Sequence, residues 1–253
     1  GLNETLYPGS TEIVKYITVH KQNTTLSVEV ITPVKAGNKT VISGILLDEQ
    51  GKAIPDVTIH VRVGDEDVGS TFTGSDGSYT FEFDETVVGT HTVTGNYEGN
   101  GTYNQSSNTA TLVVDYTNTS ISINPLEDVT IGNIVNITGK LVDEFNNPLG
   151  GATVKVTFDT DSRDVTTDTD GTFNASFTAS SVGNKTVKVE FAGNNTHTAS
   201  NDTSKVQVVP IVATISSTLP NDAKVGDTNV INVTVTDQNG NPLKDVPVNV
   251  TVN

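Results

Sequence analysis

The clearest chemical signature in the chain is the Asn-x-Ser/Thr pattern, which is the acceptor sequence for N-linked glycans. It occurs at 13 of the 25 asparagines, more often than a random placement of serines and threonines predicts. Several of these sites fall in predicted turns or on the polar faces of strands, so we predict glycosylation at some of them. Ordinary solvated asparagines are the alternative. The sites are Asn3, Asn23, Asn38, Asn100, Asn104, Asn118, Asn136, Asn174, Asn184, Asn194, Asn201, Asn232 and Asn249.

A run of aspartates in "DTDSRDVTTDTDGT" (159–172) is a second candidate site. Carboxylates spaced by one residue beside a glycine turn can wrap a hard cation such as Ca²⁺. The candidate metal ligands are Asp159, Asp161, Asp168 and Asp170. However, Asp170 followed by glycine is also typical of a hairpin turn, and the twelve-residue calcium loop with its closing Glu is absent. Calcium is therefore the one cofactor that the sequence raises, and a plain hairpin is the stronger interpretation.

Enzyme motifs are missing from the sequence. It has no Gly-x-Ser-x-Gly elbow, His-Glu-x-x-His pair, phosphate-binding glycine loop or Cys/His cluster. Paired acids at 65–67 and 84–85 could serve glycoside hydrolysis, but they do not recur in the next copy of the repeat described below, which favours solvated turns. The histidines are scattered, and we expect no enzyme activity. They are His20, His60, His91 and His197.

The segments that carry these residues recur along the chain at a spacing of 94 to 95 residues. "GILLDEQGKAIPDVTIHV" (44–61) returns as "GKLVDEFNNPLGGATVKV" (139–156) and as "VTVTDQNGNPLKDVPVNV" (233–250). The hairpin "SDGSYTFEF" (75–83) likewise returns as "TDGTFNASF" (169–177). A fixed period of this length is typical of tandem domains.

The two ends of the chain are out of phase with this repeat. The third copy stops at Asn253, which corresponds to Asp159, and the first residues resemble the last strand of a unit. We therefore expect a window on a longer array. Its predicted parts are the closing strand of a preceding unit (1–22), two whole units (23–116 and 117–210) and the first half of a further unit (211–253).

Within each unit apolar and polar residues alternate, which is the period of a half-buried β-strand. Val57, Ile59, Val61 and Val63 form one such series, and a similar series covers 246–252. Seven short strands in about 95 residues fit a two-sheet sandwich, so the expected fold class is all-β. For the first unit we predict strands near 25–31, 40–48, 56–63, 68–73, 78–84, 91–97 and 109–114.

Composition restricts the partners of the chain. Thirty acidic and 14 basic residues give a formal net charge of −16, and this field would repel nucleic acids and anionic membrane surfaces. The chain has no cysteine, so each unit must close on its own apolar core. We expect no nucleic acid partner and no membrane contact within this segment.

The repeated segments resemble a known family. The D-x-x-G/N-x-x-I/L stretch, the D-G-x-Y/F hairpin and the V-G-x-x-T-V…G-N…S ending are similar to bacterial and archaeal Ig-like repeats. Such repeats occur in invasin-like and adhesin-like surface proteins, including Asn- and Thr-rich adhesin-like proteins of methanogenic archaea. The resemblance covers nearly all of 20–253 and implies tandem Ig-like seven-stranded β-sandwich domains at the cell surface. His197 replaces the aromatic Tyr103, and Asn146 replaces Gly51, which indicates drift in a scaffold.

Some Ig-like adhesin modules carry a Lys–Asn or Lys–Asp isopeptide cross-link in place of a disulfide. The resemblance therefore raises this possibility for Lys39 and Lys140, which lie near the second predicted strand. Neither lysine recurs in all units, so the cross-link is a minor alternative.

The function expected from these observations is structural. We interpret the chain as an extracellular stalk or filament segment of a glycosylated adhesin-like surface protein, whose partners are neighbouring Ig-like units or copies of itself. One alternative is an adhesin module whose loops bind a host or neighbour-cell ligand. Another is a subunit that polymerises because a second chain's strand completes the opened third unit.

Overall fold

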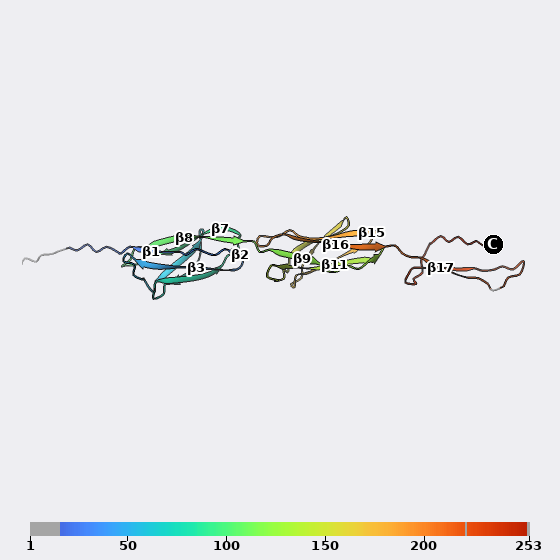
Figure 1. Cartoon of the computed structure of the whole chain (residues 1–253), viewed down its shortest axis with the longest axis horizontal. Coiled ribbons are helices and arrows are strands. Elements are labelled where there is room, and N and C mark those ends of the chain that lie inside the picture. The colour runs from blue at the N-terminus through green and yellow to red at the C-terminus, as the bar shows by residue number, and fades with distance from the viewer. Residues whose placement is uncertain (1–15, 221, 252–253) are drawn as a thin grey trace, which may run out of the picture. The chain divides into compact units, whose positions relative to one another are not determined.

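The structure is a computed structural model that describes residues 16–220 and 222–251. All regular elements among these residues are β-strands, and none of the described residues forms a helix that could cross a membrane. The chain divides into two compact units, Gly1–Tyr116 and Thr117–Asn253 (Figure 1).

The first unit contains a sandwich of two sheets, which we call the first module. Its smaller sheet has three strands in the order β1-β3-β6, and its larger sheet has five in the order β2-β8-β7-β4-β5. The smaller sheet consists of β1 (Thr24–Leu26), β3 (Lys39–Asp48) and β6 (Ser78–Asp84). The larger sheet consists of β2 (Val34–Lys35), β4 (Thr58–Val63), β5 (Glu66–Phe72), β7 (Gly89–Tyr97) and β8 (Ser106–Asp115).

The second unit begins with a sandwich of the same topology, the second module. Its sheets have the orders β9-β11-β14 and β10-β16-β15-β12-β13, so each strand has the neighbours of its counterpart in the first module. The strands are β9 (Thr119–Ile123), β10 (Val129–Thr130), β11 (Ile134–Asp143), β12 (Thr153–Phe158), β13 (Asp161–Thr166), β14 (Thr172–Thr178), β15 (Gly183–Phe191) and β16 (Ser200–Val209). The predicted all-β fold class of tandem Ig-like sandwiches is confirmed.

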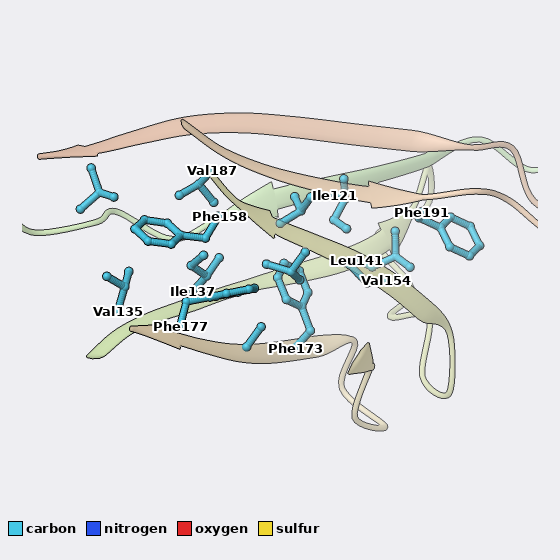
Figure 2. Packing of buried hydrophobic residues seen from close by; sticks show 14 of the residues in the cluster. Ile121, Val135, Ile137, Leu141, Val154, Phe158, Phe173, Phe177, Val187 and Phe191 are labelled. Atoms are coloured by element: carbon cyan, nitrogen blue, oxygen red, sulfur yellow. The ribbon is translucent and has the colours of Figure 1, made fainter. Parts of the chain in front are cut away.

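Each module has its own apolar core between its two sheets. Figure 2 shows the core of the second module, where Phe158 of the larger sheet packs near Phe177 of the smaller one, with ring centroids 5.8 Å apart. In the first module Ile59 and Val61 of β4 are fully buried, as the alternating pattern predicts. Burial of apolar area is the main stabilising contribution in a fold without disulfides.

The first predicted strand, 25–31, is wrong in its extent. In the first module β1 ends at Leu26, and the chain then crosses to the other sheet as β2. Pro33 stands between the two pieces, and Pro125 occupies the same gap between β9 and β10. Proline lacks an N–H and cannot continue a ladder, which explains why the strand is interrupted before it changes sheets.

The segment after the second module forms one antiparallel pair, β17 (Thr214–Thr218) with β18 (Asn232–Thr236). The predicted strand at 246–252 is wrong for the residues described, since none of 246–251 is in a strand. In the second module the equivalent strand β12 is held between β13 and β15, whereas no strand is paired with 246–251 among the described residues.

The predicted closing strand at the start of the chain lies mostly outside the described residues. Of its last positions, 16–20 are not in a strand. Gln22 bridges to Tyr103, and its N–H donates to the carbonyl oxygen of Thr102 at 2.8 Å. Gln22 is therefore attached to the first module.

The turns of the copies share one backbone conformation. Gly51, Asn146 and Gly240 stand at equivalent positions, with φ angles of 79°, 64° and 82°. Asparagine is among the few residues other than glycine that adopt this left-handed region readily. The replacement of Gly51 by Asn146 therefore keeps the turn.

Candidate functional site

The recurring aspartates Asp48, Asp143 and Asp237 each hold the turn that follows them. Asp143, only 8% exposed, accepts hydrogen bonds at Oδ1 from the N–H groups of Phe145 (2.9 Å) and Asn147 (2.8 Å). The other two aspartates accept the same pair of bonds from residues two and four positions on. Burial raises the pKa of Asp143, but the hydrogen bonds from Asn147 and Phe145 outweigh burial and lower the pKa below its usual 3.8. These carboxylates have a structural role.

The predicted calcium ligands are spread from the β12–β13 turn to the turn before β14. Asp159 lies in the β12–β13 turn, and its Oδ2 is 3.1 Å from Nζ of Lys185. Asp161 begins β13, whereas Asp168 and Asp170 follow its end. Within the described ranges, no three His, Cys, Asp or Glu side chains gather where they could hold a metal ion. Calcium binding stays a prediction, which a calcium titration of the melting temperature tests.

Asp170 has a role in the turn before β14. The hairpin predicted here is wrong, because β13 and β14 lie in different sheets. Its Oδ1 accepts hydrogen bonds from Oγ1 (2.6 Å) and from the N–H (3.0 Å) of Thr172, and both lower the pKa of Asp170. Asp76 makes the same two bonds to Ser78 in the first module. This geometry is that of an Asx turn, which accounts for an aspartate at this position in both copies.

The lysines considered for an isopeptide cross-link are both exposed. Nζ of Lys39 lies 2.7 Å from Oε2 of Glu82, on the neighbouring strand. The hydrogen bond to Glu82 raises the pKa of Lys39. Lys39 thus forms a solvent-exposed ion pair, and no buried acid of the kind that this cross-link requires is beside it.

The four histidines lie in separate surroundings. His60 is 4.0 Å from Glu98 through Nε2 and Oε1, and Nε2 of His91 is 2.6 Å from the carbonyl oxygen of Val87. Nδ1 of His197 is 2.8 Å from Oγ1 of Thr196 and 3.3 Å from Oδ1 of Asn194. His20 is exposed outside the strands. Each contact is local along the chain or at the surface.

The predicted glycosylation sites are at the surface. Asn3 lies outside the described residues, and every other site is exposed except Asn104, which is half-buried. Asn136 and Asn174 lie on adjacent strands of the smaller sheet of the second module. Asn100 and Asn194 occupy equivalent loops between the last two strands of the two modules. Glycosylation at these positions stays a prediction.

A shallow groove recurs beside the loops of Asn100 and Asn194. In the first module it has a volume of about 310 Å³, and in the second about 710 Å³. All eight residues that line the first groove have their counterparts, 94 or 95 positions on, in the lining of the second. They are Asp56, Val57, Thr58, His60, Tyr97, Glu98, Gly99 and Asn100. Sequence reasoning missed this groove, because its residues come from two distant stretches of each repeat.

Sequence analysis also missed the parallel strand pair that closes each module. In the first module Val34 and Lys35 of β2 pair with Val114 and Asp115 of β8 in parallel. In the second, β10 pairs in the same way with β16. A strand of two residues has no periodicity to detect, and the Pro33 and Pro125 breaks were the one available signal.

Comparison with known proteins agrees with this fold. No family model matches the chain. The inverse autotransporter adhesin YeeJ of Escherichia coli (strain K12) is 25% identical over 240 residues, which cover 85% of this chain and 10% of that protein. The chain is related to the bacterial Ig-like adhesins. The expected location of these Ig-like modules, outside the cell at its surface, is confirmed by this relationship.

The fold of these Ig-like adhesin modules is also found in a solved structure. Invasin, described as a bacterial integrin-binding protein, is 18% identical and superposes with a TM-score of 0.52. The match covers 88% of this chain and 48% of that one. The chain thus spans about a tenth of the curated relative and about half of the invasin structure. It is an adhesin-like cell-surface protein with invasin-like domains.

Proposed function

We propose that this chain is a load-bearing stalk segment of an adhesin-like surface protein, and that its modules transmit tension along the chain. The observation that carries the proposal is the parallel pairing of the second strand of each module with its last strand, β2 with β8 and β10 with β16. The chain enters each module through a short strand of the smaller sheet, β1 or β9, continues as β2 or β10, and leaves through β8 or β16. Tension on the two ends of a module therefore acts on the parallel pair from both sides.

Parallel pairing decides how the tension acts. When the two ends of a module are pulled apart, parallel strands are drawn in opposite directions along their length. All the bonds between them are then loaded together, in shear. Strands pulled sideways would instead open one bond at a time, each of which contributes only about 1 kcal/mol. The observed arrangement is the one that resists tension.

Hydrogen bonds next to the parallel pairs extend this connection. The N–H of Ala36 donates to the carbonyl oxygen of Asp115 at 2.9 Å, and Nζ of Lys35 donates to that of Tyr116 at 3.0 Å. In the second module the N–H of Ile131 donates to the carbonyl oxygen of Val209 at 2.9 Å. Both modules therefore have further hydrogen bonds beside the parallel pair that connects β2 to β8 or β10 to β16.

Single-molecule pulling of the first module in two directions tests the proposal. The chain has no cysteine, so introduced cysteines give unique handles. His20→Cys with Tyr116→Cys loads the module along its ends. Asp65→Cys with Tyr116→Cys pulls across the larger sheet, because the β4–β5 turn and the C-terminal end of β8 lie at the same end of the strands. We expect a clearly higher unfolding force for the first pair. Equal forces would overturn the proposal.

A ligand-binding adhesin module is the second candidate function. It is favoured by the relationship to invasin, whose description names integrin binding, and by the groove that recurs in both modules. A pull-down with the chain against host-cell or neighbour-cell surface extracts separates the two, since a spacer retains nothing. In either case we propose that the chain has no enzyme activity.

We also propose that the chain is part of a longer array of Ig-like domains. We take 23–116 and 117–210 as whole Ig-like domains, 211–253 as the first half of a further one and 1–22 as the end of a preceding one. Apolar residues of the third part, including Ile215 and Val250, are more than half exposed. If a second copy supplies strands to this part, light scattering will show concentration-dependent filaments. We further propose that the protein is archaeal and glycosylated, as its Asn- and Thr-rich composition suggests.

A further inference from the structure

We propose that Asn100 and Asn194, one of the two pairs of acceptor patterns at equivalent positions in the modules, are N-glycan attachment sites, and that Asn104, in the same loop as Asn100, stays unmodified. This inference rests on the proposed function only in its need for an extracellular, glycosylated protein. It does not depend on the direction in which the modules resist force. The three residues all stand in Asn-x-Ser/Thr patterns, so the pattern alone does not distinguish them.

The loop holds the side-chain oxygen of Asn100 by hydrogen bonds and leaves its side-chain nitrogen available for modification. Oδ1 of Asn100 accepts hydrogen bonds from the N–H groups of Thr102 (2.8 Å) and Tyr103 (2.9 Å). Nδ2 has no hydrogen-bond partner in the described part of the chain, and the residue is exposed. The amide nitrogen to which a glycan is joined is therefore held at the surface in a defined orientation.

Asn194 repeats this geometry in the second module. Its Oδ1 accepts hydrogen bonds from the N–H groups of Thr196 (2.9 Å) and His197 (2.8 Å). Oγ1 of Thr196, the hydroxyl of the same acceptor pattern, donates to that oxygen at 3.1 Å. Two modules whose sequences have diverged thus keep an acceptor asparagine in one turn conformation.

Space for the first sugar residues exists beside both asparagines. Asn100 and Asn194 line the recurring groove, and polar or charged side chains lie along its floor. In the second module these include Lys155, Asp164 and Glu190. Sugar hydroxyl groups can hydrogen-bond to such groups, and apolar residues such as Tyr97 and Phe191 line the same grooves.

Asn104 differs from Asn100 in the hydrogen bonds of its side-chain nitrogen and in its burial. Its Nδ2 donates to Oδ1 of Asn23 at 2.9 Å and lies 3.5 Å from the carbonyl oxygen of Lys21. Its backbone N–H donates to the carbonyl oxygen of Gln22 at 2.8 Å, and the residue is half-buried. The acceptor nitrogen is occupied by the contacts that attach the start of the first module to this loop.

The reaction itself is a substitution at the sugar. Nδ2 attacks the anomeric carbon of a phosphate-activated, lipid-linked oligosaccharide. The N–C bond forms as the bond from that carbon to the phosphate oxygen breaks, the phosphate leaves with the electron pair, and the amide loses one proton to the medium. At Asn104 the amide must first give up its hydrogen bonds, so we expect roughly tenfold less modification than at Asn100.

The test is glycan transfer to the purified, folded chain by an oligosaccharyltransferase of relaxed sequence specificity, supplied with a lipid-linked oligosaccharide. Glycopeptide mass spectrometry measures occupancy at each asparagine. We expect modification at Asn100 and Asn194 and roughly a tenth as much at Asn104. The matched control is the unfolded peptide 96–108, in which Asn100 and Asn104 should be modified to similar extents. The variants Asn100→Gln and Asn194→Gln assign the two signals.

Three outcomes would overturn the proposal. The first is Asn104 modified as fully as Asn100 in the folded chain, and the second is neither Asn100 nor Asn194 modified. The third is the same Asn100 to Asn104 ratio in the peptide as in the folded chain, which would make the local sequence and not the fold responsible. Pulling experiments on unmodified protein remain unaffected by any of these results.

Discussion

At the scale of single residues, Gly44 and Gly139 show how tightly the smaller sheet packs. A Cβ on Gly44 would overlap the carbonyl oxygen of Ser27 and come within 2.7 Å of the Tyr79 ring. At Gly139 the equivalent atoms are the carbonyl oxygen of Ser122 and the Phe173 ring. A glycine at this position is required by the close approach of its neighbours.

Gly44→Ala therefore tests this packing. Overpacking of this kind costs about 1–3 kcal/mol, and we expect a loss of that size in the free energy of unfolding of the first module, measured by urea denaturation. Gly101→Ala is the matched control, because its Cβ would meet no atom within 4 Å. Equal stability of the two variants would contradict the expected overlap.

Tyr79 provides a pH-dependent test of a buried hydroxyl. Its OH donates to the carbonyl oxygen of Ser27 at 2.7 Å, and burial, with a smaller effect of Glu29, raises its pKa to about 12. A raised folded-state pKa means that the contribution to stability is complete below pH 10 and is lost as the pH rises toward 12.

Tyr79→Phe should therefore lower the unfolding free energy of the first module by about 1 kcal/mol at pH 8. The difference from the unmodified chain should shrink as the pH rises above 10, because the unfolded tyrosine ionises first. Urea denaturation at several pH values measures this difference. The second module, which has Phe173 at this position, serves as an internal control. If the difference in unfolding free energy does not change with pH, the hydrogen bond from Tyr79 to Ser27 does not stabilise the module as expected.

At the scale of elements, the parallel pair β2–β8 gives a specific prediction. Ala36→Pro removes the N–H that donates to Asp115 and changes the side chain little. We expect a lower unfolding force when the module is pulled by its ends, and a loss of about 1–3 kcal/mol in equilibrium stability. Ala36→Ser keeps the N–H and should keep the force. An unchanged unfolding force in the Ala36→Pro variant would show that other contacts of the module resist the tension.

At the scale of the whole molecule, the two modules should unfold independently, because each has its own core. Leu46 and Leu141 are equivalent and fully buried. Leu46→Ala should destabilise the first module by about 2–5 kcal/mol, and Leu141→Ala the second by the same amount. Calorimetry should show one transition shifted in each variant and both in the double variant. A single variant that shifts both transitions would contradict independence.

The sequence by itself predicted most of the fold. Alternation located β4 and β12, and the Asp-Gly pairs located the turns before β6 and β14, because both signals arise within a few consecutive residues. The predicted hairpins at these turns are wrong, since β5 and β13 lie in the larger sheets and β6 and β14 in the smaller ones. It also predicted that Asn146 stands where Gly51 does. It failed at β2 and β10, which are too short to show a period, and at 246–252, where the pattern is present but the neighbouring strands are not.

For the candidate sites, the sequence and the tertiary structure determined clearly different properties. The sequence determined which asparagines can accept a glycan and that the units repeat, since both are written in consecutive residues. Only the tertiary structure decided that Nδ2 of Asn104 is occupied by Asn23 while Asn100 is exposed, and that β2 pairs with β8 and β10 with β16 in parallel. Residues 81 positions apart share a hydrogen bond only after the chain has folded, so no local pattern can record it.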